Sequence, residues 1–84
     1  MSKTLMVTIR TDETYDIGYR RGHVIESDND AFNVAIGKYK DHYNEVNDGG
    51  EPYAPAAKLI SKTKVARDFG ERPFWVYEFE CYCF

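Results

Sequence analysis

Hydrophobic and polar residues alternate near the start of the chain. In residues 4–10, TLMVTIR, the side chains of Leu5, Val7 and Ile9 share one face. A period of two with β-branched residues predicts a strand with one buried and one solvated face. Residues 15–26, YDIGYRRGHVIE, resume this character, with a bulge expected at Arg20-Arg21-Gly22. We expect these first two strands to form a hairpin.

Residues 27–50, SDNDAFNVAIGKYKDHYNEVNDGG, change to a helical period. Ser27 or Asp28 is the expected N-cap, and Ser27 with Asp30 approximates a capping box. Gly49-Gly50 suits the helix end, because glycine accepts left-handed geometry. The apolar positions recur at i, i+3, i+4 and i+7: Phe32, Ala35, Ile36, Tyr39, Tyr43 and Val46. This spacing predicts one amphipathic helix.

Two further alternating segments follow the proline-containing loop EPYAPAA. In residues 58–69 we expect Leu59 and Val65 to point inward, and the other face to carry Lys58, Ile60, Lys62 and Lys64. In residues 74–84 the face expected beneath the helix holds Trp75, Tyr77, Phe79, Cys81 and Cys83, and the opposite face holds Phe74, Val76, Glu78, Glu80, Tyr82 and Phe84. A turn near Glu71 would place Lys62 opposite Glu80, and Lys64 opposite Glu78.

The order β-β-α-β-β predicts an α+β domain spanning residues 1–84, with a single amphipathic helix on an antiparallel four-stranded sheet. A chain of 84 residues has room for one domain. Its apolar runs are far shorter than the ~18–20 residues of a membrane-spanning helix. The first residues lack the apolar core of a signal peptide, so we expect a cytoplasmic protein with reduced cysteines.

Charge is unevenly distributed along the chain. Residues 26–51 hold two bases and seven acids, a charge of −5, whereas the flanks together carry +2. The helix and the loop NDGGEPY could therefore present a negative surface that attracts a basic partner. We predict that the contacts to such a protein partner come from Asp41, Glu45, Asp48, Glu51 and Tyr53. The alternative is that these charges only keep the helix solvated.

A second hypothesis is single-stranded nucleic-acid binding. The bases that could form a patch for it are Arg20, Arg21, Lys58, Lys62, Lys64 and Arg67, with Lys58, Lys62, Lys64 and Arg67 on one strand face. Phe74 or Tyr82 could stack on bases. Glu78 and Glu80 lie opposite these lysines in the expected register, and the isoelectric point near 5.3 is unfavourable for binding phosphates.

Cys81 and Cys83 raise the question of chemistry at the chain end. Residues two apart in a strand point the same way, which is poor geometry for a mutual disulfide. With His23 and His42 they could supply four zinc ligands, but the paired spacings of zinc sites are absent. A pairing of Cys83 or Ser61 with a histidine stays open. We expect buried structural thiols, no catalytic residue, no metal and no cofactor.

The segment GHVIESDNDAFNVAIGKY, a strand that runs through an acidic cap into an amphipathic helix, resembles small phage-encoded proteins. Among these are anti-CRISPR inhibitors built as one helix on an antiparallel sheet. The resemblance is architectural and transfers no functional residue. It implies a non-enzymatic inhibitor that occupies a basic nucleic-acid-binding or partner surface of a host defence complex, in the host cytoplasm.

The outer face of the last strand is a further candidate surface. Its apolar members are Phe74, Val76, Tyr82 and Phe84. No other predicted element covers them, so this face is expected to be a homodimer seam or part of the binding surface.

Overall fold

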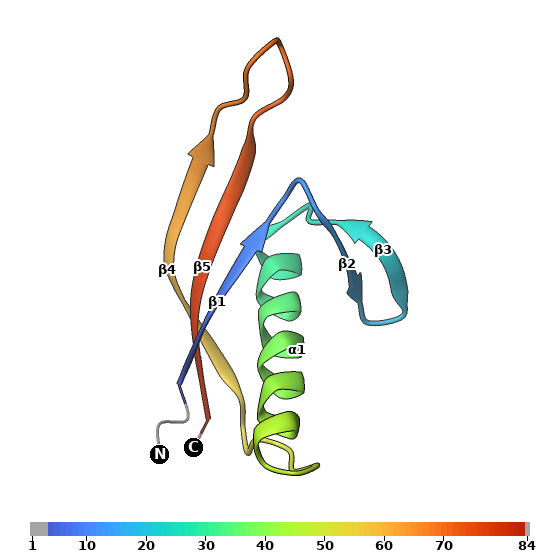
Figure 1. Ribbon diagram of the computed structural model, residues 1–84, viewed down its shortest axis with the longest axis vertical. Coiled ribbons are helices and arrows are strands. Elements are labelled where there is room, and N and C mark those ends of the chain that lie inside the picture. The colour runs from blue at the N-terminus through green and yellow to red at the C-terminus, as the bar shows by residue number, and fades with distance from the viewer. Residues whose placement is uncertain (1–3, 84) are drawn as a thin grey trace.

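The computed structural model describes residues 4–83 and confirms an α+β architecture with one helix and antiparallel strands in that range (Figure 1). The elements in chain order are β1 (Leu5–Arg10), β2 (Thr14–Ile17), β3 (Arg20–Val24), α1 (Asp28–Val46), β4 (Ala56–Val65) and β5 (Phe74–Tyr82). The segment predicted as a second strand is therefore a hairpin of two short strands.

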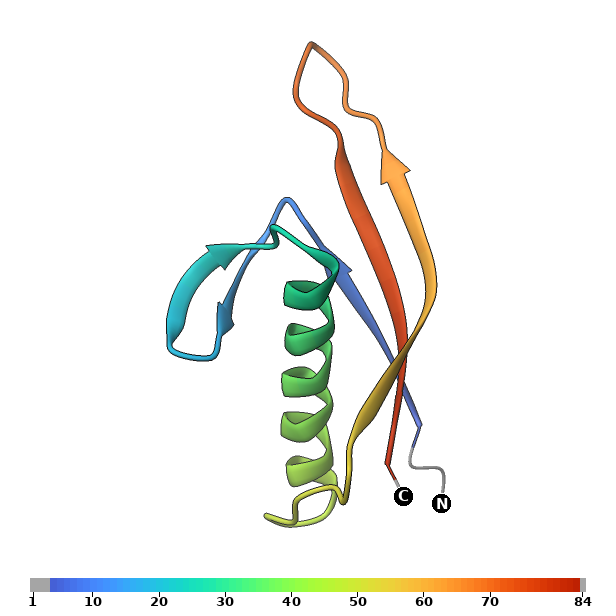
Figure 2. The ribbon, with the colours of Figure 1, turned by 180° about the vertical axis from the view of Figure 1, so that it is seen from behind.

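The strands form two sheets instead of the predicted single four-stranded sheet. One sheet has the order β1-β5-β4, and the other consists of β2 and β3 (Figure 2). The predicted hairpin between the first two segments is wrong, because β1 pairs with β5, with Ile9 opposite Tyr77. The physical reason is a two-residue turn, Gly18–Tyr19, in which Gly18 has a φ of 61°. Such a turn lets residues 14–24 pair with themselves.

The predicted bulge in the second segment is confirmed. Tyr15 lies opposite His23 and Ile17 lies opposite Arg20, so β3 holds one residue more than β2 between these pairs. Gly22 occupies this site with a φ of 64°, and its N–H donates to Asp16 Oδ1 at 3.1 Å. The extra residue twists the hairpin more strongly, as bulges do.

Ser27 is the N-cap of α1, as predicted. Its Oγ accepts a hydrogen bond from the Asp30 N–H at 3.1 Å. The Asp30 carboxylate accepts from the Glu26 N–H at 3.2 Å instead of the N-cap N–H that a capping box would use. It also accepts from Arg20 Nη2 at 3.1 Å. Asp30 thus connects the start of the helix to β3.

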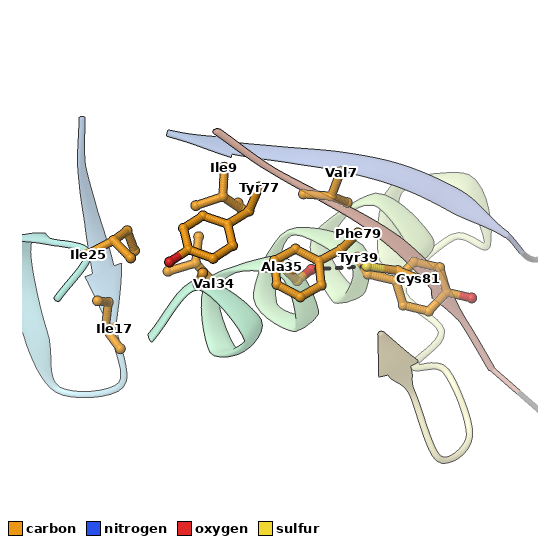
Figure 3. Packing of buried hydrophobic residues seen from close by; sticks show 11 residues of the cluster. Val7, Ile9, Ile17, Ile25, Val34, Ala35, Tyr39, Tyr77, Phe79 and Cys81 are labelled. Carbon is orange, nitrogen blue, oxygen red and sulfur yellow. Dashed lines mark hydrogen bonds between the residues drawn. The ribbon is translucent and has the colours of Figure 1, made fainter. Parts of the chain in front are cut away.

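The core lies between α1 and the helix-facing side of the three-stranded sheet (Figure 3). Its buried members are Val7, Ile9, Ile17, Ile25, Ala31, Val34, Ala35, Tyr39, Tyr77, Phe79 and Cys81. The predicted inner faces of β1 and of the central part of β5 are confirmed. Trp75, near the start of β5, is predicted to lie on the same inner face, but its side chain is not buried, because the residue is 39% exposed.

The buried stripe of α1 is rotated relative to the prediction. Ala31 and Val34 are buried, whereas Phe32 and Val46 are exposed. The rings of Tyr77 and Phe79 occupy the space between the layers, so small helix residues fit over them. Phe32 lies beside this contact and meets the Phe79 ring edge-on at a centroid distance of 6.4 Å.

The β4–β5 hairpin turns earlier than predicted. The Glu71 N–H donates to the Asp68 carbonyl at 3.5 Å, and the central residues Phe69 and Gly70 have φ values of 62° and 76°. Two positive φ values are the pattern of a type I′ turn. The predicted pairs of Lys62 with Glu80 and Lys64 with Glu78 are therefore wrong: Lys62 lies opposite Tyr77, and Lys64 opposite Trp75.

A bulge at Ile60 changes the faces of β4. The register shifts between Leu59 and Ser61. Odd-numbered residues therefore face the helix before the bulge, and even-numbered residues face it after the bulge. Lys58 lies opposite Glu80 on the outer face, whereas Lys62 shares the helix-facing side with Tyr77. Val65, predicted to point inward, pairs with Phe74 on the outer side.

This change of face creates a polar cluster at the start of α1. The Lys62 ammonium lies 2.9 Å from Asp28 Oδ1, and the Tyr77 hydroxyl donates to the same oxygen at 2.7 Å. The ammonium is also 5.0 Å and 5.1 Å from the ring centroids of Trp75 and Tyr77. The cluster joins the helix N-terminus to β4 and β5, and the hydrogen bonds from Tyr77 and Lys62 lower the pKa of Asp28.

The hairpin tip yields a stability prediction. The Phe69 ring is fully exposed and the residue has a left-handed φ, so Phe69→Asn removes strain without removing packing. We expect the free energy of unfolding to rise by about 0.5–1 kcal/mol in urea denaturation. Tyr19→Asn is the matched control, because Tyr19 is equally exposed but has no left-handed φ. Equal effects of the two substitutions would contradict the prediction.

The cluster at Asp28 yields a pH prediction. The folded state lowers the pKa of Asp28 below 3.8, so its ion pair stabilises the fold above that pH and is lost as the pH falls through the folded pKa. Asp28→Asn should therefore destabilise the protein at pH 7 and have a smaller effect at pH 3. Urea unfolding at both pH values measures this difference, and a pH-independent difference would refute it.

A candidate partner-binding groove along the helix

A groove lies between the C-terminal half of α1 and the loop that leads to β4. Its volume is about 580 Å³. Its walls are formed by Lys40, Asp41, Asn44, Glu45, Glu51, Pro52 and Pro55. The loop returns along the helix after the turn at residues 47–49, so Glu51 reaches the same groove as Asp41 and Glu45. Three of the five predicted contact residues are thereby brought together.

A second groove, of about 450 Å³, lies between α1 and β1. It is lined by Leu5, Met6, Val7, Thr8, Lys38, Asp41, His42 and Glu45. Asp41 and Glu45 therefore line both grooves. They are one helical turn apart and form an acidic ridge between two concave surfaces.

The acidic ridge, Asp41 and Glu45, lies toward the negative end of the helix dipole. The last turn of α1 contains no basic residue to offset the unpaired carbonyls. Asp48 follows directly, in the left-handed exit turn with a φ of 55°. The carboxylates and the helix dipole thus add to one another, and the negative potential is concentrated at this end of α1.

The other two predicted contacts lie outside the walls of both grooves. Asp48 is exposed in the turn after the helix, and Tyr53 is 77% exposed on the following loop. They are adjacent to the acidic ridge in the chain and accessible to a large partner.

The residues of the nucleic-acid hypothesis do not form one strand face. The bulge at Ile60 places Lys58 on the outer side of the sheet and Lys62 on the helix side. Three of the six bases are ion-paired within the protein, Arg20 with Asp30, Lys62 with Asp28 and Arg67 with Asp12. Arg20 and Arg21 belong to β3, in the other sheet, and Lys64 lies opposite Trp75. The geometry gives no continuous basic track for a phosphate backbone.

The predicted outer apolar face is partly covered by the protein's own cations. The guanidinium carbons of Arg10 and Arg67 each lie 4.7 Å from the centroid of the Phe74 ring. Both arginines also bind the Asp12 carboxylate. Val76 and Tyr82 are half-buried on this face, and Phe84 lies outside the described residues. Between residues 4 and 83, no helix or strand covers this side of the sheet (Figures 1 and 2).

Two exposed aromatic residues were not identified from the sequence. Tyr19 and Phe69 are fully exposed at the turns of the two hairpins. The alternating pattern of residues 15–26 predicts Tyr19 within a strand, whereas Gly18 beside it is the local signal for the turn that the structure shows. Gly70 is the corresponding signal beside Phe69.

The two cysteines lie at the C-terminal end of β5. Cys81 is fully buried, and its Sγ–H donates to the Ala35 carbonyl at 3.7 Å. Burial raises the pKa of this thiol to about 11. Cys83 is half-buried, and both thiols are free. In the described part of the chain, no three His, Cys, Asp or Glu side chains are grouped so that they could hold a metal ion.

Comparison with protein-family models, with curated proteins and with solved structures finds no significant match for this chain. Across residues 4–83, no helix combines the length and apolar character needed to cross a membrane.

The thiols yield a reactivity prediction. At pH 8 a thiol with a pKa of about 11 is only roughly 0.1% thiolate, and Cys81 is also shielded from solvent. We expect iodoacetamide to label Cys83 at least about tenfold faster than Cys81 in the native protein. Peptide mass spectrometry after timed quenching measures the two rates, and urea should make them similar. Equal native rates would contradict the assigned burial.

Proposed function

We propose that this protein is a non-enzymatic binding module that holds a basic surface of a protein partner against α1. The observation that supports this most directly is that Asp41 and Glu45 line both grooves. Concave walls of low dielectric strengthen the field of carboxylates in a groove. Glu51 faces the same space from the exit loop, so a lysine or arginine would meet carboxylates from two elements.

The placement of Glu45 at the end of α1 is unfavourable for stability, which also supports a binding role. Glu45 lies in the last turn of α1, where an acidic side chain is unfavourable by about 0.3–1 kcal/mol because it lies at the negative end of the dipole. Local conflicts of this kind are expected at functional sites. A cationic partner would turn the same interaction into a favourable one.

The most concrete form of the proposal is an inhibitor encoded by a phage or mobile element. Its target would be a nucleic-acid-binding complex of a host defence system, because such complexes present basic channels. By occupying such a channel, an acidic module excludes nucleic acid without catalysis. The resemblance of the sequence to anti-CRISPR inhibitors, and an architecture of one helix with antiparallel sheets, favour this form of the proposal.

The proposal predicts that removing acidic charge from the ridge has opposite effects on stability and on partner binding. Glu45→Gln removes a carboxylate from the acidic ridge and from the last turn of the helix. We expect the free energy of unfolding to rise by about 0.3–1 kcal/mol, and Asp41→Lys with Glu45→Lys to abolish capture of a basic partner from a phage-host lysate.

The control is Glu71→Lys at the hairpin tip, far along the chain from the grooves, which reverses one acidic charge in the same way as each of the two substitutions in the double variant. The partner, identified by mass spectrometry and purified, should bind the wild type and Glu71→Lys with similar affinity. Partner binding that survives the double reversal at Asp41 and Glu45 would refute the proposal. A salt-sensitive gel shift of single-stranded nucleic acid by the protein itself would support the alternative function.

A further inference from the structure

The groove between α1 and β1 is lined on one side by the edge of a strand. β1 pairs with β5 along one side, and its other edge has no paired strand within residues 4–83. Leu5, Met6, Val7 and Thr8 line the groove along this edge. The second groove is thus a helix flank facing an unpaired strand edge.

The hydrogen bonds show which backbone groups face that edge. The Arg10 N–H donates to the Tyr15 hydroxyl at 3.1 Å, away from β5, whereas the Thr11 N–H donates to the Trp75 carbonyl at 3.0 Å. Backbone direction alternates along an antiparallel strand. Hence the N–H and C=O groups of Met6 and Thr8 point to the unpaired edge, and no strand among residues 4–83 pairs with them there.

The two edges of the three-stranded sheet differ in how well they are protected against pairing with another chain. Exposed edges are usually blocked by lysines, prolines or bulges, which prevent pairing with another chain. The β4 edge has the bulge at Ile60 and carries Lys58, Lys62 and Lys64. Residues 5–9 of β1, LMVTI, have no charge, proline or bulge. Only the β1 edge is suited to accept another strand.

The groove also indicates the chemistry of the incoming segment. Tyr15 binds the Arg10 N–H, and the Lys38 ammonium lies 5.4 Å from the Tyr15 ring centroid. These contacts place Lys38 toward the β2–β3 hairpin. Beyond them the helix wall carries Asp41 and Glu45. Four helix residues span about 6 Å, close to the roughly 6.7 Å between alternate residues of a strand.

We propose that the β1 edge accepts an extended basic segment of a protein partner as an additional strand of the sheet. The segment forms hydrogen bonds with the backbone N–H and C=O groups of Met6 and Thr8. Its lysine or arginine side chains, at alternate positions, point toward Asp41 and Glu45. This inference rests on the proposed function and specifies how the partner binds. A second copy of the chain is a poorer occupant, because twofold pairing through β1 would bring two acidic ridges to one seam.

The first test uses an amidated eight-residue peptide of alternating Val and Lys as the probe. Amide exchange by NMR should show that Met6 and Thr8 exchange at least about tenfold more slowly at saturating peptide, because both amides become hydrogen-bonded. The Leu5, Val7 and Ile9 amides, which already face β5, are the internal reference. A peptide of alternating Val and Glu should not bind.

The second test separates backbone pairing from charge attraction. Two isomers of the Val-Lys peptide carry N-methyl groups on all Lys amides or on all Val amides, so they have equal charge and equal methylation. Strand addition predicts affinities that differ by at least roughly tenfold, since only one set of amides faces β1. Charge attraction alone predicts equal affinities.

Protein variants provide a third comparison. Thr8→Pro removes an N–H donor from the β1 edge. Ala57→Pro is the control, because it introduces proline into β4, the strand at the other edge of the sheet, and likewise changes no charge. We expect Thr8→Pro alone to weaken peptide binding at least about tenfold, with folding verified by circular dichroism. If either variant unfolds, the exchange and N-methyl experiments on the wild-type chain decide.

The outcomes distinguish the two proposals. If Asp41→Lys with Glu45→Lys abolishes peptide binding, while the N-methyl isomers bind equally and the Met6 and Thr8 amides exchange unchanged, strand addition is wrong and the proposed function stands. If the wild type binds no Val-Lys peptide, strand addition is wrong, and partner capture by the wild type and by the double variant decides the proposed function. If Met6 and Thr8 are protected without peptide in a concentration-dependent dimer, the occupant is a second copy and the inference is overturned.

Discussion

The whole structure depends on the central position of β5. This strand pairs with β1 on one side and β4 on the other, and its helix-facing side carries Tyr77, Phe79 and Cys81 (Figure 3). Large rings leave little room between the layers, so α1 approaches with Ala31 and Ala35. Because β1 and β4 are joined only through β5 in this sheet, the three-stranded sheet and its core cannot form before residues 74–82 are in place.

The bulge at Ile60 has two consequences, one for the contact between β4 and the helix and one for the exposed edge of β4. It rotates Lys62 to the helix side, where its ammonium binds Asp28 and lies over the rings of Trp75 and Tyr77. It also interrupts the β4 edge, which discourages pairing with other chains. One extra residue thus connects the helix to the hairpin and leaves β1 as the unprotected edge of the sheet.

The proposed binding surface combines features that each disfavour the isolated protein. Carboxylates at a helix C-terminus repel the dipole, and unpaired strand groups lack hydrogen-bond partners other than water. Both features meet in the groove between α1 and β1, where Glu45 faces the edge that holds Met6 and Thr8. A basic extended segment would satisfy the charge and the backbone together, which is why we connect the two observations.

Local patterns in the sequence determined the helix cap at Ser27, the bulge before His23, the inner faces of β1 and β5, and the acidic character of residues 26–51. Each follows from neighbouring residues, where period and turn chemistry act directly. The tertiary structure alone decided that β1 pairs with β5, that β4 changes face at Ile60, and that Glu51 joins Asp41 and Glu45 around one groove. These depend on strand pairing and on the path of a loop, which are set by contacts between residues far apart in the chain. Alternation specifies the two faces of a strand but not its neighbouring strand. Gly70 signals a turn, but it does not specify that Phe69 also adopts a left-handed φ and so shifts the register of the hairpin.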